Sequence, residues 1–212
     1  MSGPRIKICG ISTAESLSAI IAARADYCGF VFFPRSPRHV SLEQVAALAD
    51  RAEGRIARVG LFVDADDLVL EQAVAAARLD ALQLHGDESP ERAAELRARF
   101  VLPVWKAIPV AAPGDVERAE RYRGAVDLVL FDAKTPKGAL PGGMGLSFDW
   151  SLLSAWKDRA PWGLAGGLNP SNVAEAAALT RAPLVDTSSG VESAPGVKDE
   201  ALIAAFCAAA RA

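Results

Sequence analysis

Cys9 and Asp132 stand at the ends of two apolar runs in this 212-residue chain, and their side chains can exchange protons. A single cysteine is more often a small buried hydrophobic residue than a catalyst, although Lys7 beside it could favour the thiolate. Asp132 could cap a helix or pair with Lys134, or it could deliver a proton as a general acid. The sequence therefore offers one candidate base and one candidate acid.

Small residues follow two later apolar runs, where tight turning is the simplest explanation for each loop taken alone. They are Gly166 and Gly167 after the first run, and Ser188, Ser189 and Gly190 after the second. Loops of this composition let a phosphate approach backbone N–H groups closely. Barrel enzymes bind phosphate in the loops after strands 7 and 8, so the two loops together predict a phosphorylated substrate.

The segment from Pro34 to Arg38 carries two arginines on a loop that prolines stiffen. It could be a solvated loop, or Arg35 and Arg38 could bind a carboxylate in bidentate geometry. His85 could be only a hydrogen-bonded residue at the rim of a site. Because His39 is the only other histidine, no histidine-rich metal site can form, and no metal is expected.

Composition excludes several classes of protein. Lys and Arg number 23 against 26 Asp and Glu, and this net charge of −3 disfavours a nucleic-acid partner. The longest charge-free stretch near the C-terminus, residues 160–174, is too short and too often broken by Pro and Gly to span a membrane. Cys28 and Cys207 are interpreted as core residues, and three scattered cysteines favour a reducing, cytoplasmic location without export.

An apolar run followed by an alanine-rich segment of helical period recurs along the whole chain. The expected strands are Arg5–Cys9, Cys28–Phe32, Ile56–Val63, Ala81–Leu84, Leu102–Ala107, Val126–Phe131, Trp162–Ala165 and Leu184–Thr187. The expected helices are Thr13–Ala25, Leu42–Ala52, Asp66–Ala77, Pro90–Arg99, Asp115–Tyr122, Trp150–Lys157, Pro170–Leu179 and Glu200–Ala210. Eight such units predict an α/β fold, a (β/α)8 TIM barrel forming one domain over residues 1–212, with a doubly wound sheet as the alternative.

Alternation along the strands predicts which side chains point into the barrel. The expected inward-facing or rim residues are Lys7, Cys9, Gln83, His85, Asp132, Asp186 and Ser188. A lysine inside a barrel needs an anion, and Asp186 is the plausible partner of Lys7. Polar side chains are thus expected to meet at the mouth formed by the carboxyl ends of the strands.

These residues belong to motifs that together resemble phosphoribosylanthranilate isomerase, a family of (β/α)8 barrels in tryptophan biosynthesis. The motifs are Lys7–Ile11, Gly29–Phe32, Pro34–Arg38, Val59–Val63, Gln83–Gly86, Phe148–Trp150, Ala165–Pro170 and Val185–Glu192. They occur in order from the first strand to the last loop, so the resemblance covers nearly the whole chain. The loop Lys137–Pro141 is of variable length in this comparison, which leaves loop closure open.

The resemblance implies conversion of N-(5-phosphoribosyl)anthranilate to 1-(2-carboxyphenylamino)-1-deoxyribulose 5-phosphate, an Amadori rearrangement without metal or cofactor. It implies that Cys9 is the general base, that Asp132 is the general acid, and that Arg38 holds the anthranilate carboxylate. It assigns the phosphate cradle to Gly166, Gly167, Ser188, Ser189 and Gly190.

Two alternatives stay open at this point. Another phosphosugar barrel, such as a pentose-phosphate epimerase or a histidine-pathway isomerase, would share the phosphate site, but these families generally use paired aspartates, often with a metal. A binding barrel without activity is the other alternative, and the presence of both Cys9 and Asp132 argues against it.

Overall fold

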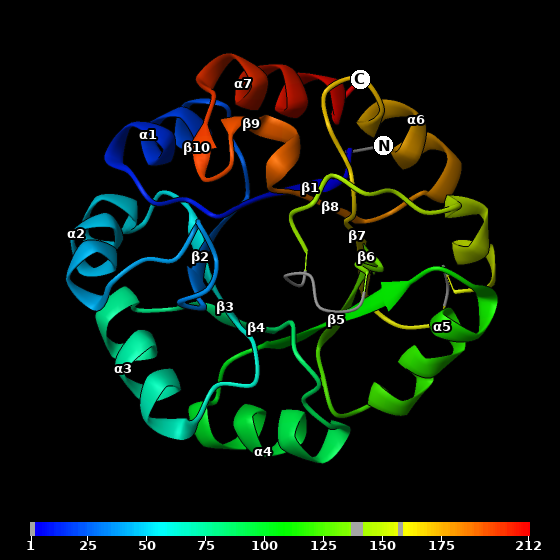
Figure 1. The fold of residues 1–212 in the computed structure, drawn as a ribbon, viewed down its shortest axis with the longest axis horizontal. Coiled ribbons are helices and arrows are strands. Elements are labelled where there is room, and N and C mark those ends of the chain that lie inside the picture. Colours follow the sequence, from blue (N-terminus) through cyan, green and yellow to red (C-terminus); the bar gives the residue numbers. More distant parts are fainter. Residues whose placement is uncertain (1–2, 137–141, 157–158) are drawn as a thin grey trace.

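The computed structural model describes residues 3–136, 142–156 and 159–212, and its parallel strands close into a barrel in chain order (Figure 1). The strands are β1 (Arg5–Cys9), β2 (Tyr27–Phe32), β3 (Ala57–Phe62), β4 (Ala81–Leu84), β5 (Val104–Val110), β6 (Leu128–Ala133), β7 (Trp162–Leu164) and β8 (Leu184–Thr187). Because β1 pairs with β8, the sheet is closed, which excludes the doubly wound alternative. The predicted (β/α)8 fold is confirmed.

Helices form a ring around the barrel (Figure 1). They are α1 (Ala14–Ala22), α2 (Leu42–Ala52), α3 (Asp67–Ala77), α4 (Pro90–Phe100), α5 (Pro113–Glu117), α6 (Val173–Thr180) and α7 (Glu200–Ala209), with 3-10 helices η1 (Arg118–Tyr122), η2 (Trp150–Ala155) and η3 (Ser189–Val191). Several begin at a side chain that accepts a hydrogen bond from a free backbone N–H group of the first turn. Thr13, Ser41, Asp66, Ser89 and Asp199 act in this way.

Apolar side chains fill two layers of the structure. Outward-facing strand residues such as Ile6, Ile8 and Phe131 pack against the helices in the main core. Inside the barrel, Trp105 and Leu130 belong to a separate apolar cluster. The barrel interior is therefore a packed core, in which a few buried polar side chains, such as Lys7 and Gln83, lie among apolar ones.

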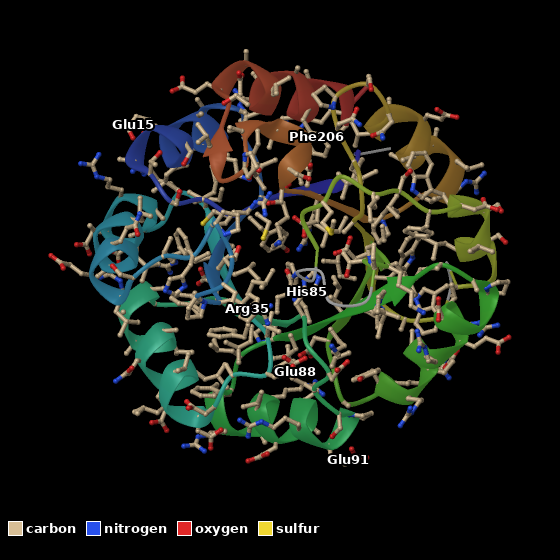
Figure 2. All side chains as sticks on the ribbon, viewed as in Figure 1. Glu15, Arg35, His85, Glu88, Glu91 and Phe206 are labelled. Atoms are coloured by element: carbon tan, nitrogen blue, oxygen red, sulfur yellow. The ribbon has the colours of Figure 1, made fainter. Side chains whose placement is uncertain are left out.

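The alternation predicted for the strands is confirmed where polar residues enter the barrel. Lys7 is fully buried, and its Nζ lies 2.8 Å from Oδ2 of Asp186, the predicted partner. Gln83 is also fully buried, while its neighbours Leu82 and Leu84 face the helices. Figure 2 shows His85 near the barrel axis, whereas Glu91 lies on the outer ring.

Three predicted helices differ from the structure. The predicted helix Asp115–Tyr122 is a short α5 that begins at Pro113 and tightens into the 3-10 helix η1. The predicted helix from Trp150 is the 3-10 helix η2, and its expected end at Lys157 lies outside the described residues. The helix predicted from Pro170 begins only at Val173, because Asn169 binds Ser171 in a local turn.

A small hairpin after the barrel was not predicted. Strands β9 (Glu192–Ala194) and β10 (Val197–Lys198) pair antiparallel between η3 and α7. The predicted loop Lys137–Pro141 lies outside the described residues. Among the residues that are described, no helix has the length and apolarity needed to cross a membrane.

Candidate active site

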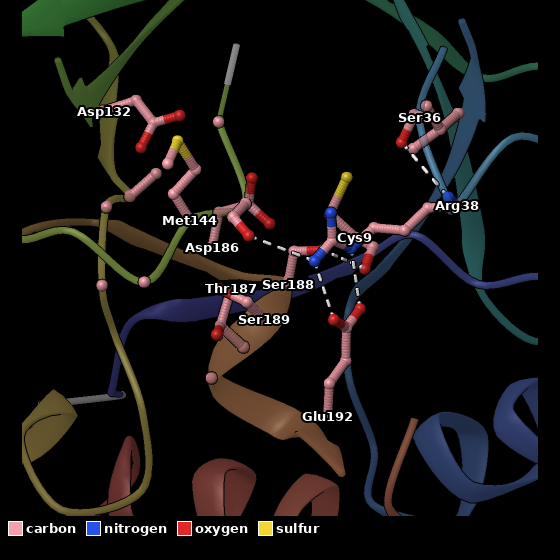
Figure 3. A pocket seen from close by; sticks show the side chains of 18 of the residues that line it. Cys9, Ser36, Arg38, Asp132, Met144, Asp186, Thr187, Ser188, Ser189 and Glu192 are labelled. Carbon is pink, nitrogen blue, oxygen red and sulfur yellow. Dashed lines mark hydrogen bonds and ion pairs between the residues drawn. The ribbon is translucent and has the colours of Figure 1, made fainter. Parts of the chain in front are cut away.

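A pocket of about 590 Å³ opens at the mouth of the barrel, where the carboxyl ends of the strands meet (Figure 3). The structure brings all the predicted site residues into its lining: Cys9, Arg38, Asp132, Gly166, Gly167, Ser188, Ser189 and Gly190. They come from loops and strand ends far apart in the sequence. Convergence at this end of the barrel is typical of active sites in (β/α)8 enzymes.

Cys9 ends β1 at the floor of the pocket, and its side chain is buried. Nζ of Lys7 donates a 2.8 Å hydrogen bond to the Asp186 carboxylate, and the positive charge of Lys7 acts on the nearby Cys9 thiol. Burial raises the pKa of the Cys9 thiol above its ordinary value and outweighs the lowering effect of Lys7 and Lys198. Lys7 therefore favours the thiolate, as predicted, but its effect on the pKa is smaller than that of burial.

Asp132 lies near the end of β6 and faces the pocket. Its Oδ1 accepts a hydrogen bond of 2.8 Å from the backbone N–H of Ala133, and its Oδ2 lies 3.1 Å from Nε2 of His85. Lys134 pairs instead with Asp115 at 3.8 Å, so the alternative of an Asp132–Lys134 ion pair is wrong. Ala133 and His85 therefore hold the Asp132 carboxyl group in place, and the group faces the pocket.

His85 connects Asp132 to the polar floor of the barrel. Nε2 of Gln83 lies 3.3 Å from Nδ1 of His85. With the Gln83 amide as donor, Nδ1 accepts and Nε2 carries the proton that points to Asp132. His85 is thus more than a rim residue, and its signal in the sequence is its parity with Gln83 on β4.

The glycine loop after β7 and the loop after β8 touch each other closely. Gly166 and Gly167 have φ values of +83° and +65°, which favour glycine. A Cβ on Gly190 would lie 1.9 Å from the carbonyl oxygen of Leu168, and the hydroxyl of Thr187 donates to that same oxygen at 2.6 Å. Side chains are therefore excluded here, and the backbone lines the pocket.

Arg38 lines the pocket and is held by Glu192. Its Nε and Nη2 each donate to a carboxylate oxygen of Glu192 at 2.7 Å, and Nη2 also donates to Gly143 at 3.2 Å. Arg35 is exposed and does not line the pocket, so the idea that both arginines bind one ligand is wrong. Glu192 ends one of the family motifs but no role was predicted for it, and its second partner Lys198 was not predicted, although the Pro195–Gly196 turn signals a hairpin there.

Metal ligation has little support in the described ranges 3–136, 142–156 and 159–212. They contain no group of three or more His, Cys, Asp or Glu side chains arranged to hold a metal ion. The groups that face the pocket are a thiol, carboxyls, an imidazole, an arginine and backbone N–H groups. Their chemistry is that of proton transfer and anion binding.

A closed barrel with a polar pocket at this mouth places the chain in the class of (β/α)8-barrel enzymes. Residues 6–209 match the family model for N-(5'phosphoribosyl)anthranilate (PRA) isomerase. The N-(5'-phosphoribosyl)anthranilate isomerase of Cereibacter sphaeroides is 56% identical, with 100% of each chain covered. The chain therefore belongs to the phosphoribosylanthranilate isomerase family.

Solved structures agree with this assignment. The phosphoribosyl anthranilate isomerase of Thermotoga maritima superposes with a TM-score of 0.88 at 38% identity, covering 98% of both chains. A phosphoribosyl anthranilate isomerase in complex with reduced 1-(o-carboxyphenylamino)-1-deoxyribulose 5-phosphate gives a TM-score of 0.86 at 36% identity over 98% of both chains. The similarity covers every strand that contributes to the pocket.

Proposed function

We propose that Cys9 and Asp132 carry out the reaction of this family, the isomerisation of N-(5'-phosphoribosyl)anthranilate to the aminodeoxyribulose phosphate of tryptophan biosynthesis. The chain is an isomerase of this family. The observation that supports the roles is the placement of one thiol and one carboxyl group in the same pocket, on β1 and β6. One acid and one base suffice for the chemistry.

Asp132 acts first as the general acid. The furanose C–O bond at C1 breaks as the proton of Asp132 passes to the ring oxygen, and the nitrogen lone pair forms a C=N bond to C1. The product is an open-chain Schiff base that carries a positive charge. His85, 3.1 Å from Asp132, orients the carboxyl group for this transfer.

Cys9 then acts as the general base. The positive imine makes the hydrogen on C2 acidic, and the thiolate removes it as a proton. The electron pair of the C2–H bond forms the C1=C2 double bond, and the π pair of the C=N bond returns to the nitrogen, which becomes neutral. The resulting enolamine tautomerises to the ketone. Because burial raises the pKa of Cys9 in the free protein, the thiol has to release its proton to solvent before this step, and the positive imine beside the sulfur favours that release.

The two anionic ends of the substrate bind on opposite sides of these residues. Arg38 binds the anthranilate carboxylate, since its Nη1 lies toward Gly143 at the pocket wall. The phosphate binds the loops of Gly166 and Gly167 and of Ser188, Ser189 and Gly190. The bound reduced product in a solved relative supports a small phosphosugar ligand for this pocket.

Further expectations from the sequence stay predictions. We propose that the reaction needs no metal or cofactor and that residues 1–212 act as one domain. We also expect a cytoplasmic location, consistent with three buried cysteines that form no disulfide. Neither a nucleic-acid partner nor membrane association is part of the proposal.

A fluorescence assay with purified protein tests the function. N-(5'-phosphoribosyl)anthranilate is generated in situ, EDTA is present, and loss of its fluorescence is followed with time. We expect turnover in EDTA and formation of the ketose product by mass and chromatography. A requirement for a divalent metal, or loss of fluorescence only by hydrolysis to anthranilate, would contradict the proposed mechanism.

A further inference from the structure

Glu192 and Lys198, on the two strands of the hairpin, connect Arg38 with the loop after β8. We propose that they form a positioning pair, which holds Arg38 on one side and Ser188 on the other and so fixes the separation of the two anion-binding ends. This inference rests on the proposed function, because it takes Arg38 as the carboxylate site and the Ser188 loop as the phosphate site. It adds two residues that act through Arg38 and Ser188.

Glu192 determines which atoms of Arg38 are free. It accepts 2.7 Å hydrogen bonds from Nε and Nη2, a bidentate pair that fixes the plane of the guanidinium group (Figure 3). Among the described residues, none accepts a hydrogen bond from Nη1, which lies against Gly143 at the pocket. The glutamate thus presents one edge of the arginine to a ligand.

Lys198 extends the contact to the other end. Its Nζ donates to Oε1 of Glu192 at 2.7 Å, to the backbone oxygen of Ser188 at 2.9 Å and to the hydroxyl of Ser188 at 3.2 Å. The hydroxyl of Ser188 in turn donates to the backbone oxygen of Cys9 at 3.0 Å. One ammonium group therefore joins the arginine clamp, the proposed phosphate loop and the strand of the proposed base.

The hairpin itself is tied to the arginine loop. Gly196 has a φ of +82°, and a Cβ there would lie 2.7 Å from the carbonyl oxygen of Pro37. Its backbone N–H donates to Oε2 of Glu192 at 3.2 Å. The turn of the hairpin therefore fits against the loop that carries Arg38, and a movement of one would displace the other.

Charge alone does not explain the arrangement. Side chains of Glu192 and Lys198 are only 3% and 2% exposed, so each charge needs its partner. Burial lowers the pKa of Lys198 below its ordinary value, against the raising effect of Glu192. Without Glu192 the lysine would tend to lose its proton, and the cluster would keep a net charge of about +1. Loss of Glu192 would therefore disturb the positions of Arg38 and Lys198 more than it would change the attraction of the site for anions.

Binding of the two substrate halves tests the pair. Competitive inhibition by inorganic phosphate and by anthranilate is measured for the wild type and for Glu192→Gln, Lys198→Met and Lys198→Arg. Asp80→Asn is the matched control, because Asp80 holds Arg58 in a similar two-point ion pair but at the opposite end of the barrel. Thermal unfolding of every variant is recorded in parallel.

We expect Lys198→Met to weaken both inhibitors by about tenfold, since misplaced groups lose binding at both ends. Glu192→Gln should weaken anthranilate by about tenfold and phosphate by less, and Lys198→Arg should restore part of both. Asp80→Asn should lower the melting temperature without changing either inhibition constant. If Lys198→Met behaves like Asp80→Asn, the pair is only structural and the inference is wrong.

Arg38→Met separates this inference from the proposed function. If this variant binds anthranilate as the wild type does, the proposed carboxylate site fails. If it loses anthranilate while Glu192→Gln keeps it, only the positioning pair fails. Should Lys198→Met not fold, the nearly isosteric Glu192→Gln decides alone: unchanged anthranilate inhibition in that variant overturns the pair.

Discussion

Strand β6 has an aspartate at each end, and the two have different partners. Asp127, directly before the strand, accepts a 2.9 Å hydrogen bond from the backbone N–H of Val104 and pairs with Arg97 at 2.9 Å. Asp132, near the end of the strand, has two polar partners among the described residues, the backbone N–H of its neighbour Ala133 and the imidazole of His85. The carboxylate of Asp127 is therefore bound to neighbouring elements of the fold, whereas the carboxylate of Asp132 faces the pocket, where a ligand could reach it.

The same division holds around the barrel. Asp26 and Asp80, directly before β2 and β4, also accept hydrogen bonds from backbone N–H groups of the preceding strands, at Ile6 and Arg58. At the mouth, the carboxylates of Asp186 and Glu192 are paired with lysines and face the pocket. Carboxylates at the amino ends of the strands therefore bind backbone N–H groups of the neighbouring strand, whereas those at the mouth bind side chains that line or adjoin the pocket.

Removing the thiol at the mouth should have the largest effect. Cys9→Ala is expected to lower kcat by about 1000-fold or more, because the base that removes the C2 hydrogen is lost. Steady-state assays measure kcat, and circular dichroism checks the fold. Cys28→Ala and Cys207→Ala are matched controls, since both thiols are buried outside the pocket, and comparable losses in all three would refute a special role for Cys9.

Identical substitutions at the two ends of β6 sharpen the comparison. Asp132→Asn keeps the size of the side chain and removes its transferable proton, so kcat should fall on the order of 100-fold to 10,000-fold. The melting temperature should change little, because Asn can still accept from Ala133. Near-wild-type turnover in this variant would show that another group protonates the ring oxygen.

The reactivity of Cys9 should depend on pH in a way that reports its surroundings. Burial raises its pKa, so the thiolate fraction is small at neutral pH and grows by about tenfold per pH unit below that pKa. Alkylation of Cys9 by iodoacetamide should therefore still accelerate above the pH at which a free thiol levels off. Cys28 and Cys207, with pKa values raised by burial to about 12 and about 11, should react only on unfolding. A plateau at lower pH than for a free thiol would contradict the burial argument.

The smallest effect is expected at the amino end of β6. Asp127→Asn weakens the bonds to Val104 and Arg97, so the free energy of unfolding should fall by about 1 kcal/mol. Urea titration measures this change, and kcat and KM should stay at wild-type values. A loss of activity without a loss of stability would break the proposed division between the two ends.

Much of this arrangement was predictable from the sequence, because it depends on local patterns. Alternation along β1, β4 and β6 placed Lys7, Gln83 and Asp132 on the inner side, and the demand of a buried lysine for an anion indicated Asp186. The family motifs supplied the roles that geometry alone leaves open. These inferences need only the strand period and the charge of single residues.

The remaining features depend on contacts between distant segments. Nothing near Arg38 indicates Glu192, which lies 154 residues further along the chain. Lys106 interrupts the apolar run of β5, and its partner Glu88 lies in the loop after β4. Their pairing becomes apparent only once the fold brings β4 and β5 together. The effect of Lys7 on Cys9 could be predicted from the sequence, whereas the burial that raises the pKa of Cys9 depends on the complete fold.

Trapping the imine tests the division of roles between Cys9 and Asp132 most directly. Each variant is mixed with N-(5'-phosphoribosyl)anthranilate and quenched with sodium borodeuteride, which places deuterium on C1 if it reduces the imine and on C2 if it reduces the ketone product. The mechanism predicts that Cys9→Ala accumulates C1-labelled product, because the ring still opens, and that Asp132→Asn gives little label at either carbon. C1 label in Asp132→Asn and its absence in Cys9→Ala would mean that the acid and the base are assigned to the wrong residues.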